Sequence, residues 1–245
     1  MADVAPAGTQ GGPPTPAEWE APEEPYPASD RAGLLSLVVV PAVLVSVVVA
    51  FFTGAWWLGA LLVALWAVKT WIDAYSRDPV MLRRLGARPL APHEAPRLKN
   101  ISEGLAGDLK VPPPALFVLE QGGPNAFVRK GGPGGILAVT QSLVDGYTRT
   151  ELEAVVAHCL LRLHSENFVF SSLAARWSHL GAGLAPRVGR ADDVSACALT
   201  RYPPALATAL AKADGRVTRY VPLWFAADAP SHEPTHQRVA ALAEL

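Results

Sequence analysis

TRTELEAVVAHCLLRLHSEN, residues 148–167, is the stretch that decides the fold. It opens with a capping box, in which Thr148 caps the helix and Glu151, three residues later, reaches back to it. Apolar residues then recur at helical spacing, which predicts one face packed inside a domain. These residues are Leu152, Val155, Val156, Cys159, Leu160 and Leu163. The stretch therefore predicts a buried helix that begins near Thr148.

Two polar residues of this helix have the spacing of a known metal motif. His158 and Arg162 are four residues apart and share one helical face. In H-E-x-x-H, histidines at this spacing bind zinc and the glutamate activates a water molecule. Here Cys159 stands at the glutamate position and Arg162 at the second histidine. The helix therefore keeps the spacing of the metalloprotease motif, but of the three functional residues of the motif it keeps only His158.

The composition narrows the class of protein. A net charge of −1 and a pI near 6.6 argue against a nucleic-acid partner, which would need a basic stripe. The two cysteines, Cys159 and Cys197, lie in apolar stretches and do not suggest a disulfide framework. We expect both to be small buried side chains.

The N-terminal third predicts a membrane anchor. Residues 1–30 are rich in Pro, Ala, Gly and Glu, which predicts a disordered tail. No charged residue occurs from Ala32 to Val68, and this length suits two spans better than one. Thr53-Gly54 divides the run into Ala32–Phe52 and Ala55–Tyr75. We expect a transmembrane helical hairpin over residues 31–75.

Basic residues at the exit of the hairpin predict its orientation. They are Lys69, Arg77, Arg83, Arg84 and Arg88. By the positive-inside rule, both ends of the hairpin face the cytoplasm. The sequence thus predicts a multi-pass protein of the cell membrane, with the lipid bilayer as a partner and residues 76–245 in the cytoplasm.

The rest of the chain predicts a domain of class α+β that is mainly α. Strands are expected at Ala115–Glu120, from Ala126 and at Ile136–Thr140, because these runs are rich in β-formers and bounded by Pro and Gly. Helices are expected around them: one or two within 76–110, then 148–167, 168–184, 188–199, 203–212 and 237–245.

Several segments, in one order, resemble the HtpX-type membrane-anchored zinc metalloproteases, a gluzincin family. The resemblance runs from about Arg88 to the C-terminus. It is carried by Pro124-Asn125-Ala126-Phe127, Leu137–Thr140, Thr150–His158, Ala191-Asp192, Leu199–Lys212, and Ser231-His232 with Arg238–Leu242. It implies a gluzincin-like peptidase domain over 76–245, with a small β-sheet packed on the zinc-type helix.

The resemblance also implies a site, which this chain departs from. The family's zinc ligands fall at His158, Arg162 and Val188, and its general base falls at Cys159. The family's aspartate, here Asp192, holds the first histidine. We therefore expect His158 and Asp192 as a vestigial site, and Cys159, Arg162 and Val188 as degenerate positions with no catalytic role.

Physical chemistry opposes zinc at such a site. Catalytic zinc needs three protein ligands, and a guanidinium has no lone pair to donate. A guanidinium about 4 Å from a divalent ion costs roughly 8 kcal/mol at an effective dielectric near 20. We expect no cofactor and no metal, with His158 the ligand if any metal binds. We expect Arg162 to fill the vacated volume and to form a salt bridge with Asp192 or Glu166.

Two hypotheses of function follow. The first is a non-catalytic pseudopeptidase that binds or scaffolds membrane proteins and takes an extended peptide along Ile136–Thr140. The alternative is an active zinc metalloendopeptidase in membrane-protein quality control, with atypical ligands from His158, Cys159 and His164 or His232. A Cys159 nucleophile activated by His158 is disfavoured, since the two are adjacent on one helix. His164 and His179 are expected at surface or boundary positions and His232 in a packed structural one.

Overall fold

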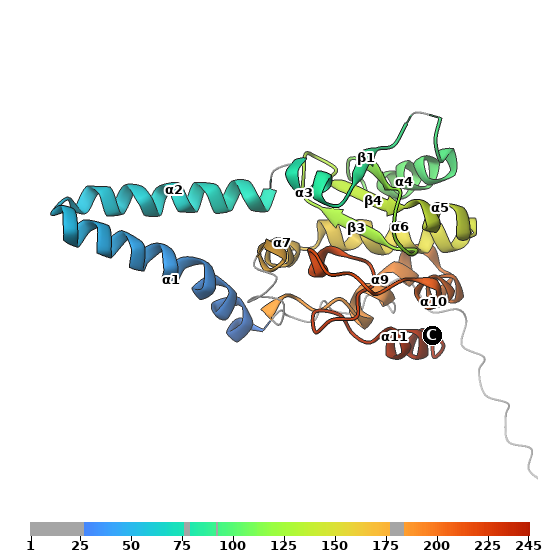
Figure 1. Cartoon of the computed structure of the whole chain (residues 1–245). Coiled ribbons are helices and arrows are strands. Elements are labelled where there is room, and N and C mark those ends of the chain that lie inside the picture. The colour runs from blue at the N-terminus through green and yellow to red at the C-terminus, as the bar shows by residue number, and fades with distance from the viewer. Residues whose placement is uncertain (1–26, 76–78, 92, 177–183) are drawn as a thin grey trace, which may run out of the picture.

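The computed structural model describes residues 27–75, 79–91, 93–176 and 184–245. Two long helices, α1 (Ala28–Thr53) and α2 (Trp56–Tyr75), project together from one side of a folded domain (Figure 1). The expected tail over residues 1–30 lies outside the described residues up to position 26, and α1 begins at Ala28, earlier than expected.

A turn at Gly54 and close packing join the two helices into an antiparallel pair. Gly54 adopts a φ of 69° and its N–H bonds to the carbonyl of Ala50, which ends α1. A Cβ on Gly59 would meet the carbonyl oxygen of Ser46 at 2.8 Å, so α2 approaches α1 closely only because this residue is glycine. The indole N–H of Trp66 donates to the carbonyl of Val38 at 3.1 Å.

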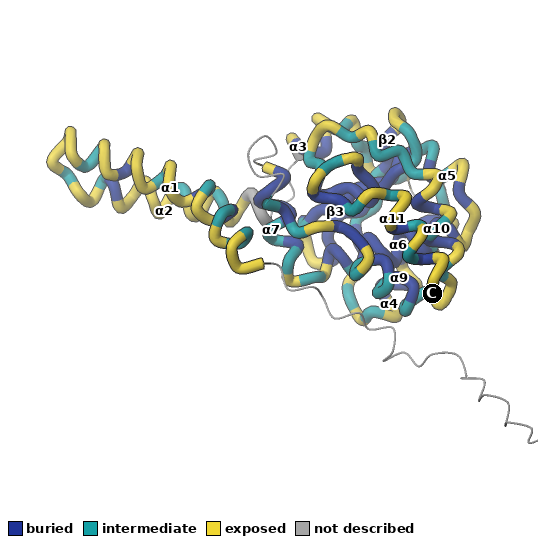
Figure 2. The backbone as a smooth tube through the Cα atoms, turned by 90° about the horizontal axis from the view of Figure 1, so that it is seen from below, coloured by how far each residue is buried: buried dark blue, intermediate teal, exposed yellow. Residues whose placement is uncertain are grey.

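Most residues of this pair are exposed (Figure 2), and many of the exposed residues are large and apolar. Phe51 and Phe52, near the turn, are each 81% exposed. Of the described helices, α1 alone is long and apolar enough to cross a membrane by length and composition. The apolar part of α2, Trp56–Ile72, is shorter. A candidate membrane helix is therefore present, while the crossing of α2 stays a prediction.

The domain contains a small mixed sheet. Its strands are β1 (Ala87–Pro89), β2 (Ala115–Leu119), β3 (Ala126–Arg129) and β4 (Ile136–Thr140), in the order β1-β2-β4-β3. β2 and β4 are parallel, and the other neighbours are antiparallel. Because β4 is paired on both sides, the expected peptide pairing along Ile136–Thr140 is wrong.

The helix expected over 148–167 is α6 (Arg149–His164), and its capping box forms as predicted. The N–H of Thr148 donates to Oε2 of Glu151 at 2.8 Å, and the N–H of Glu151 donates to Oγ1 of Thr148 at 3.3 Å. Lys212 forms a second contact with this glutamate, 2.7 Å from Oε1. The apolar residues that α6 buries form part of the main hydrophobic core.

The remaining helices complete a mainly helical domain. They are α3 (Pro79–Arg84), α4 (Pro96–Asp108), α5 (Gln141–Gly146), α7 (Phe168–Arg176), α9 (Arg190–Thr200), α10 (Pro203–Lys212), the 3-10 helix η3 (Val221–Leu223) and α11 (Thr235–Leu242). A second, smaller cluster of Leu34, Leu173, Ala174 and Ala185 packs the start of α1 against α7. The domain thereby holds the base of the helix pair.

Candidate functional site

His158 lies at the centre of the candidate site and is completely buried on α6. Its Nδ1 is 3.2 Å from Oδ1 of Asp193, a distance of ion pairing, although the direction departs from that of a hydrogen bond. Its ring packs edge-on against Phe225, with 5.1 Å between centroids. Its Nε2 has no hydrogen-bond partner among the described residues, so one polar atom points into protein that does not satisfy it.

Asp193, rather than the expected Asp192, is the carboxylate beside this histidine. Nε and Nη2 of Arg238 donate to its two oxygens at 2.7 and 2.6 Å. Burial alone would raise the pKa of Asp193, but the paired guanidinium of Arg238 outweighs burial and lowers it to about 2. Asp192 instead accepts the N–H of Gly189 at 3.3 Å and caps the start of α9.

Arg162 is buried and bound to backbone groups. Its Nη1 donates to the carbonyl of Trp224 at 3.0 Å, and its Nη2 donates to the carbonyl of Pro222. Burial lowers the pKa of Arg162 to about 10, so the guanidinium stays charged at neutral pH. Asp192 attracts this charge from a longer range.

The expected salt bridge of Arg162 with Asp192 or Glu166 is therefore wrong. No ion pair joins Arg162 to either carboxylate, all three residues being described, and Glu166 is exposed. Two backbone carbonyl dipoles stabilise the buried guanidinium charge in place of a carboxylate partner.

Cys159 cannot take over the role of a base. The thiol is 1% exposed, and burial raises its pKa to about 12. At neutral pH the group is a neutral thiol, whereas a general base needs a pKa near the working pH. Cys197 is also buried, and burial raises its pKa to about 12 as well. Both cysteines thus pack as small apolar side chains, as expected.

The position of the third ligand holds Val188, which is fully buried and offers no donor atom. Its backbone forms a bridge with His232, with its N–H donating to the carbonyl of Ser231 at 2.9 Å. The valine therefore contributes packing and strand-like pairing only.

The other histidines do not assemble a ligand set. Nε2 of His232 is 2.9 Å from the carbonyl of Trp224, and Nδ1 is 3.1 Å from Oγ of Ser231, so both ring nitrogens are engaged. Burial, then the charge of Arg162, lowers the pKa of His232 well below its usual value. His164 is exposed and bonds to the carbonyl of Leu160. His179 lies outside the described residues.

These side chains do not fit a catalytic zinc ion. Zinc needs three lone-pair donors and an open position, and only His158 presents a free donor at the motif positions. No group of three His, Cys, Asp or Glu residues is gathered in the part of the chain that the structure describes. The guanidinium of Arg162 adds a positive charge one helical turn from His158.

A segment that the sequence did not single out forms the wall of the site. Phe225 donates its N–H to the carbonyl of Ala126 at 2.8 Å, and Trp224 bridges to Phe127, so residues 224–226 cover the outer edge of β3. Asn125 fixes this segment, since its Nδ2 donates to the carbonyl of Ala226 at 2.8 Å. In the sequence, Asn125 was marked only by its place in the Pro124-Asn125-Ala126-Phe127 motif.

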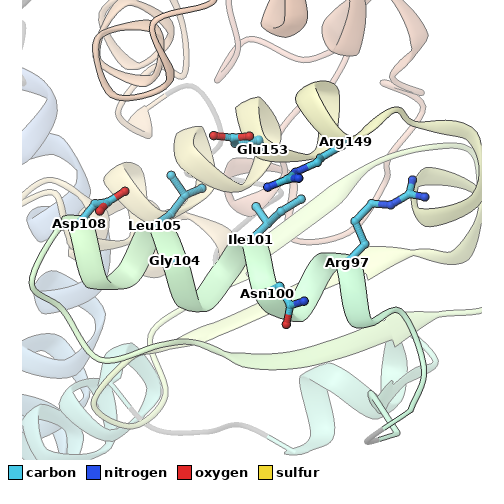
Figure 3. Close-up of a pocket in the computed structure, with 8 residues that line it drawn as sticks. All are labelled: Arg97, Asn100, Ile101, Gly104, Leu105, Asp108, Arg149 and Glu153. Atoms are coloured by element: carbon cyan, nitrogen blue, oxygen red, sulfur yellow. The ribbon is translucent and has the colours of Figure 1, made fainter.

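The described cavity of about 430 Å³ lies away from these residues, between α4 and α6 (Figure 3). Arg97 and Arg149 mark one end, and Asp108 lies at the other (Figure 3). Its lining residues are Arg97, Asn100, Ile101, Gly104, Leu105, Asp108, Arg149 and Glu153. The motif positions 158, 159, 162 and 188 do not line it.

Part of the chain is similar in sequence to known peptidases. Residues 92–180 match peptidase family M48, a match that contains β2 to β4 and α6. The chain carries an M48 peptidase domain of the HtpX type. The resemblance found in the motifs is thereby confirmed. His158 and Arg162 lie within the matched residues, at the positions that the resemblance gives to the two zinc-binding histidines of the family.

The relatives of the M48 domain are HtpX homologues. A protease HtpX homolog of Moorella thermoacetica is 28% identical over 149 residues, 59% of this chain and 50% of the relative. One from Pyrococcus abyssi is 34% identical over 105 residues, 42% of this chain and 36% of the relative. One from Dictyoglomus thermophilum is 33% identical over 101 residues, which are 41% of this chain and 33% of the relative. The chain thus spans half or less of the length of these relatives.

Proposed function

We propose that this protein is a membrane-anchored, non-catalytic relative of the HtpX proteases, a pseudopeptidase that binds or scaffolds membrane proteins. The domain would face the cytoplasm, and α1 and α2 would both cross the cell membrane. The proposal combines an M48 peptidase domain with a site whose donors do not fit zinc.

The observation that carries the proposal is the binding of Arg162 to the carbonyls of Pro222 and Trp224. The second ligand position is held by a cation that is fixed by two hydrogen bonds. A metal ion beside it would meet charge repulsion, and the arginine could leave only by abandoning two buried carbonyl groups. Loss of hydrolysis follows, because peptidase chemistry in this fold depends on a metal-activated water molecule.

The proposed use rests on the helix pair. Exposed apolar side chains along α1 and α2 are suited to lipid and to the membrane segments of other proteins. The sheet offers less to an extended peptide, since β4 is central and residues 224–226 cover β3. We therefore assign partner recognition to the helix pair, and the partner is a membrane-embedded segment.

A metal determination on the full chain tests the proposal. The protein is purified in detergent, incubated with zinc, dialysed and measured by elemental mass spectrometry, with casein cleavage followed in parallel. We expect less than 0.1 zinc per chain and no chelator-sensitive cleavage, that is, about a tenth or less of the one-to-one stoichiometry of a structural or catalytic site. An HtpX protease with a complete H-E-x-x-H helix is the positive control.

One zinc per chain, removable by a chelator together with casein cleavage, would favour the alternative of an active zinc metalloendopeptidase. That alternative requires ligands recruited from outside the motif. The engaged nitrogens of His232 and the exposed position of His164 speak against it.

A further inference from the structure

Arginine side chains gather where the domain meets the helix pair. α3 begins four residues after the end of α2 and lies beside the base of the pair (Figure 1). Arg83 and Arg84 end α3, and both are exposed. Exposed Arg219 reaches the same place from a distant part of the sequence, because its Nη1 is 3.5 Å from the carbonyl of Arg84. Arg83, Arg84 and Arg219 are called the basic cluster below.

Other charged residues lie on the elements around the basic cluster. α2 carries Lys69, and α7, at the base of the pair, ends with exposed Arg176. Lys130 lies 5.8 Å from the ring centroid of Phe168, the first residue of α7. The carboxylates on or next to these elements in the sequence are Asp30 at the start of α1, Asp73 within α2, Asp78 just before α3 and exposed Glu166 before α7.

Arg88, in contrast to the basic cluster, is an arginine whose charge is neutralised by carboxylates. Its guanidinium binds Glu94 at 2.6 Å and Glu120 at 2.8 Å. Arg84 and Arg219 have no such carboxylate partner among the described residues, although they lie in the same part of the domain. The side chain of Arg219 lies against the backbone of Arg84, so two exposed arginines without carboxylate partners occur at one place, and such a surface favours an anion.

We propose that the basic cluster binds the phosphodiester headgroups of anionic phospholipids in the leaflet that faces the domain. The inference rests on the proposed insertion of α1 and α2, which would place α3 at headgroup level. Guanidinium groups bind phosphate oxygens through paired N–H donors, and anionic leaflets attract basic residues near the membrane surface. Each arginine is expected to strengthen the preference for an anionic lipid about fivefold.

The experiment uses the full chain in detergent micelles. Dioleoylphosphatidylglycerol or dioleoylphosphatidylcholine is titrated in, and the melting temperature is followed at about 0.05 M and about 0.5 M salt, where screening lengths differ severalfold. The test variant is Arg84→Gln/Arg219→Gln. The charge-matched control is Arg97→Gln/Arg149→Gln, which removes two exposed arginines at the α4–α6 cavity, away from the helix pair.

We expect phosphatidylglycerol to raise the melting temperature of the wild type and of the control at low salt, with phosphatidylcholine far weaker. Half-saturation for Arg84→Gln/Arg219→Gln should need about 25-fold more phosphatidylglycerol. Equal responses to the two lipids, or an unchanged response of the test variant, would overturn the inference. So would an equal rise with inorganic phosphate, which would mark a generic anion site.

A flotation assay separates this inference from the proposed function. The full chain is reconstituted into neutral phosphatidylcholine vesicles and washed at alkaline pH. Loss of the protein from the vesicles would remove the membrane anchor and the inference together. Retention without any preference for phosphatidylglycerol would leave the anchor in place and reject the basic cluster as a lipid site.

Discussion

Nη1 of Arg162 lies 3.0 Å from the carbonyl oxygen of Trp224, and Nε2 of His232 lies 2.9 Å from the same oxygen. The carbonyl of Trp224 therefore binds one side chain from α6, Arg162, and one from the C-terminal region, His232. In this chain two hydrogen bonds that the guanidinium of Arg162 donates, together with the packing of His158 on Phe225, link α6 to residues 221–226.

Replacing Arg162 with alanine is expected to destabilise the domain by about 3 kcal/mol, because the buried carbonyl of Pro222 loses its side-chain donor, that of Trp224 keeps only His232, and a cavity opens. Thermal unfolding of the full chain in detergent measures the effect. Arg149→Ala, at an exposed position, is the control and should stay within about 0.5 kcal/mol of the wild type. Equal melting temperatures for Arg162→Ala and the control would contradict the role assigned to Arg162.

The triple variant Cys159→Glu/Arg162→His/Val188→Glu is expected to bind zinc, since it restores two ligands beside His158 and a base. Elemental analysis should find about one zinc per chain, the stoichiometry of a three-ligand site. Arg162→His alone should remain nearly metal-free, because two histidines are too few. A triple variant that folds but takes up no zinc would show that more than the ligands has been lost from this M48 domain.

Acid should weaken the pair of Asp193 and Arg238. The folded-state pKa of Asp193, about 2, lies below its ordinary value of 3.8, so the stabilisation is complete above about pH 4 and disappears as the pH falls toward 2. The shift corresponds to about 2 kcal/mol.

Asp193→Asn should flatten that part of the stability curve, and it should lower stability at pH 7 by about 3–5 kcal/mol, because Arg238 is then buried without a counter-charge. Urea midpoints between pH 2 and pH 7 test this prediction. Asp145→Asn, on the exposed part of α5, is the control and should keep the wild-type slope. An unaltered slope in Asp193→Asn would assign the acid sensitivity to other groups.

Two glycines in helices should respond to alanine in opposite ways. Gly59→Ala places a Cβ 2.8 Å from the backbone of Ser46 and should cost about 1–3 kcal/mol by forcing α1 and α2 apart. Gly104→Ala meets nothing within 4 Å on α4 and should stabilise the domain by about 0.5–1 kcal/mol.

Melting temperatures in detergent compare the two glycine variants, and the indole N–H resonance of Trp66 reports the α1–α2 contact. That resonance should shift in Gly59→Ala and stay in place in Gly104→Ala. A Gly59→Ala protein with unchanged stability and an unchanged Trp66 signal would mean that the two helices tolerate a wider separation.

Local signals in the sequence predicted much of the fold. The capping box and apolar spacing predicted α6, and runs of β-formers predicted β2, β3 and β4. The three-residue strand β1 was missed because Ala87-Arg88-Pro89 has no apolar alternation. The central place of β4 was missed because it depends on a parallel crossover from β2, which no local pattern reports.

The site was less predictable, because its contacts come from distant segments. The resemblance pointed to Asp192, yet adjacent helical residues point about 100° apart, and it is Asp193 that faces His158. The partners of Arg162 are backbone carbonyls, which leave no signature in side-chain identity. The pairing of Arg238 with Asp193 joins residues 45 apart and needs the folded chain.

Residues 224–226 also shield the edge of β3 from pairing with a second copy of the protein. An uncovered strand edge presents unpaired N–H and C=O groups to any neighbouring molecule, and this is how ordered aggregates begin. At β3 that row is shielded by Trp224 and Phe225, which Arg162 and Asn125 hold in place. The buried arginine at the second motif position would then also serve colloidal solubility, keeping crowded copies of this domain from polymerising edge to edge.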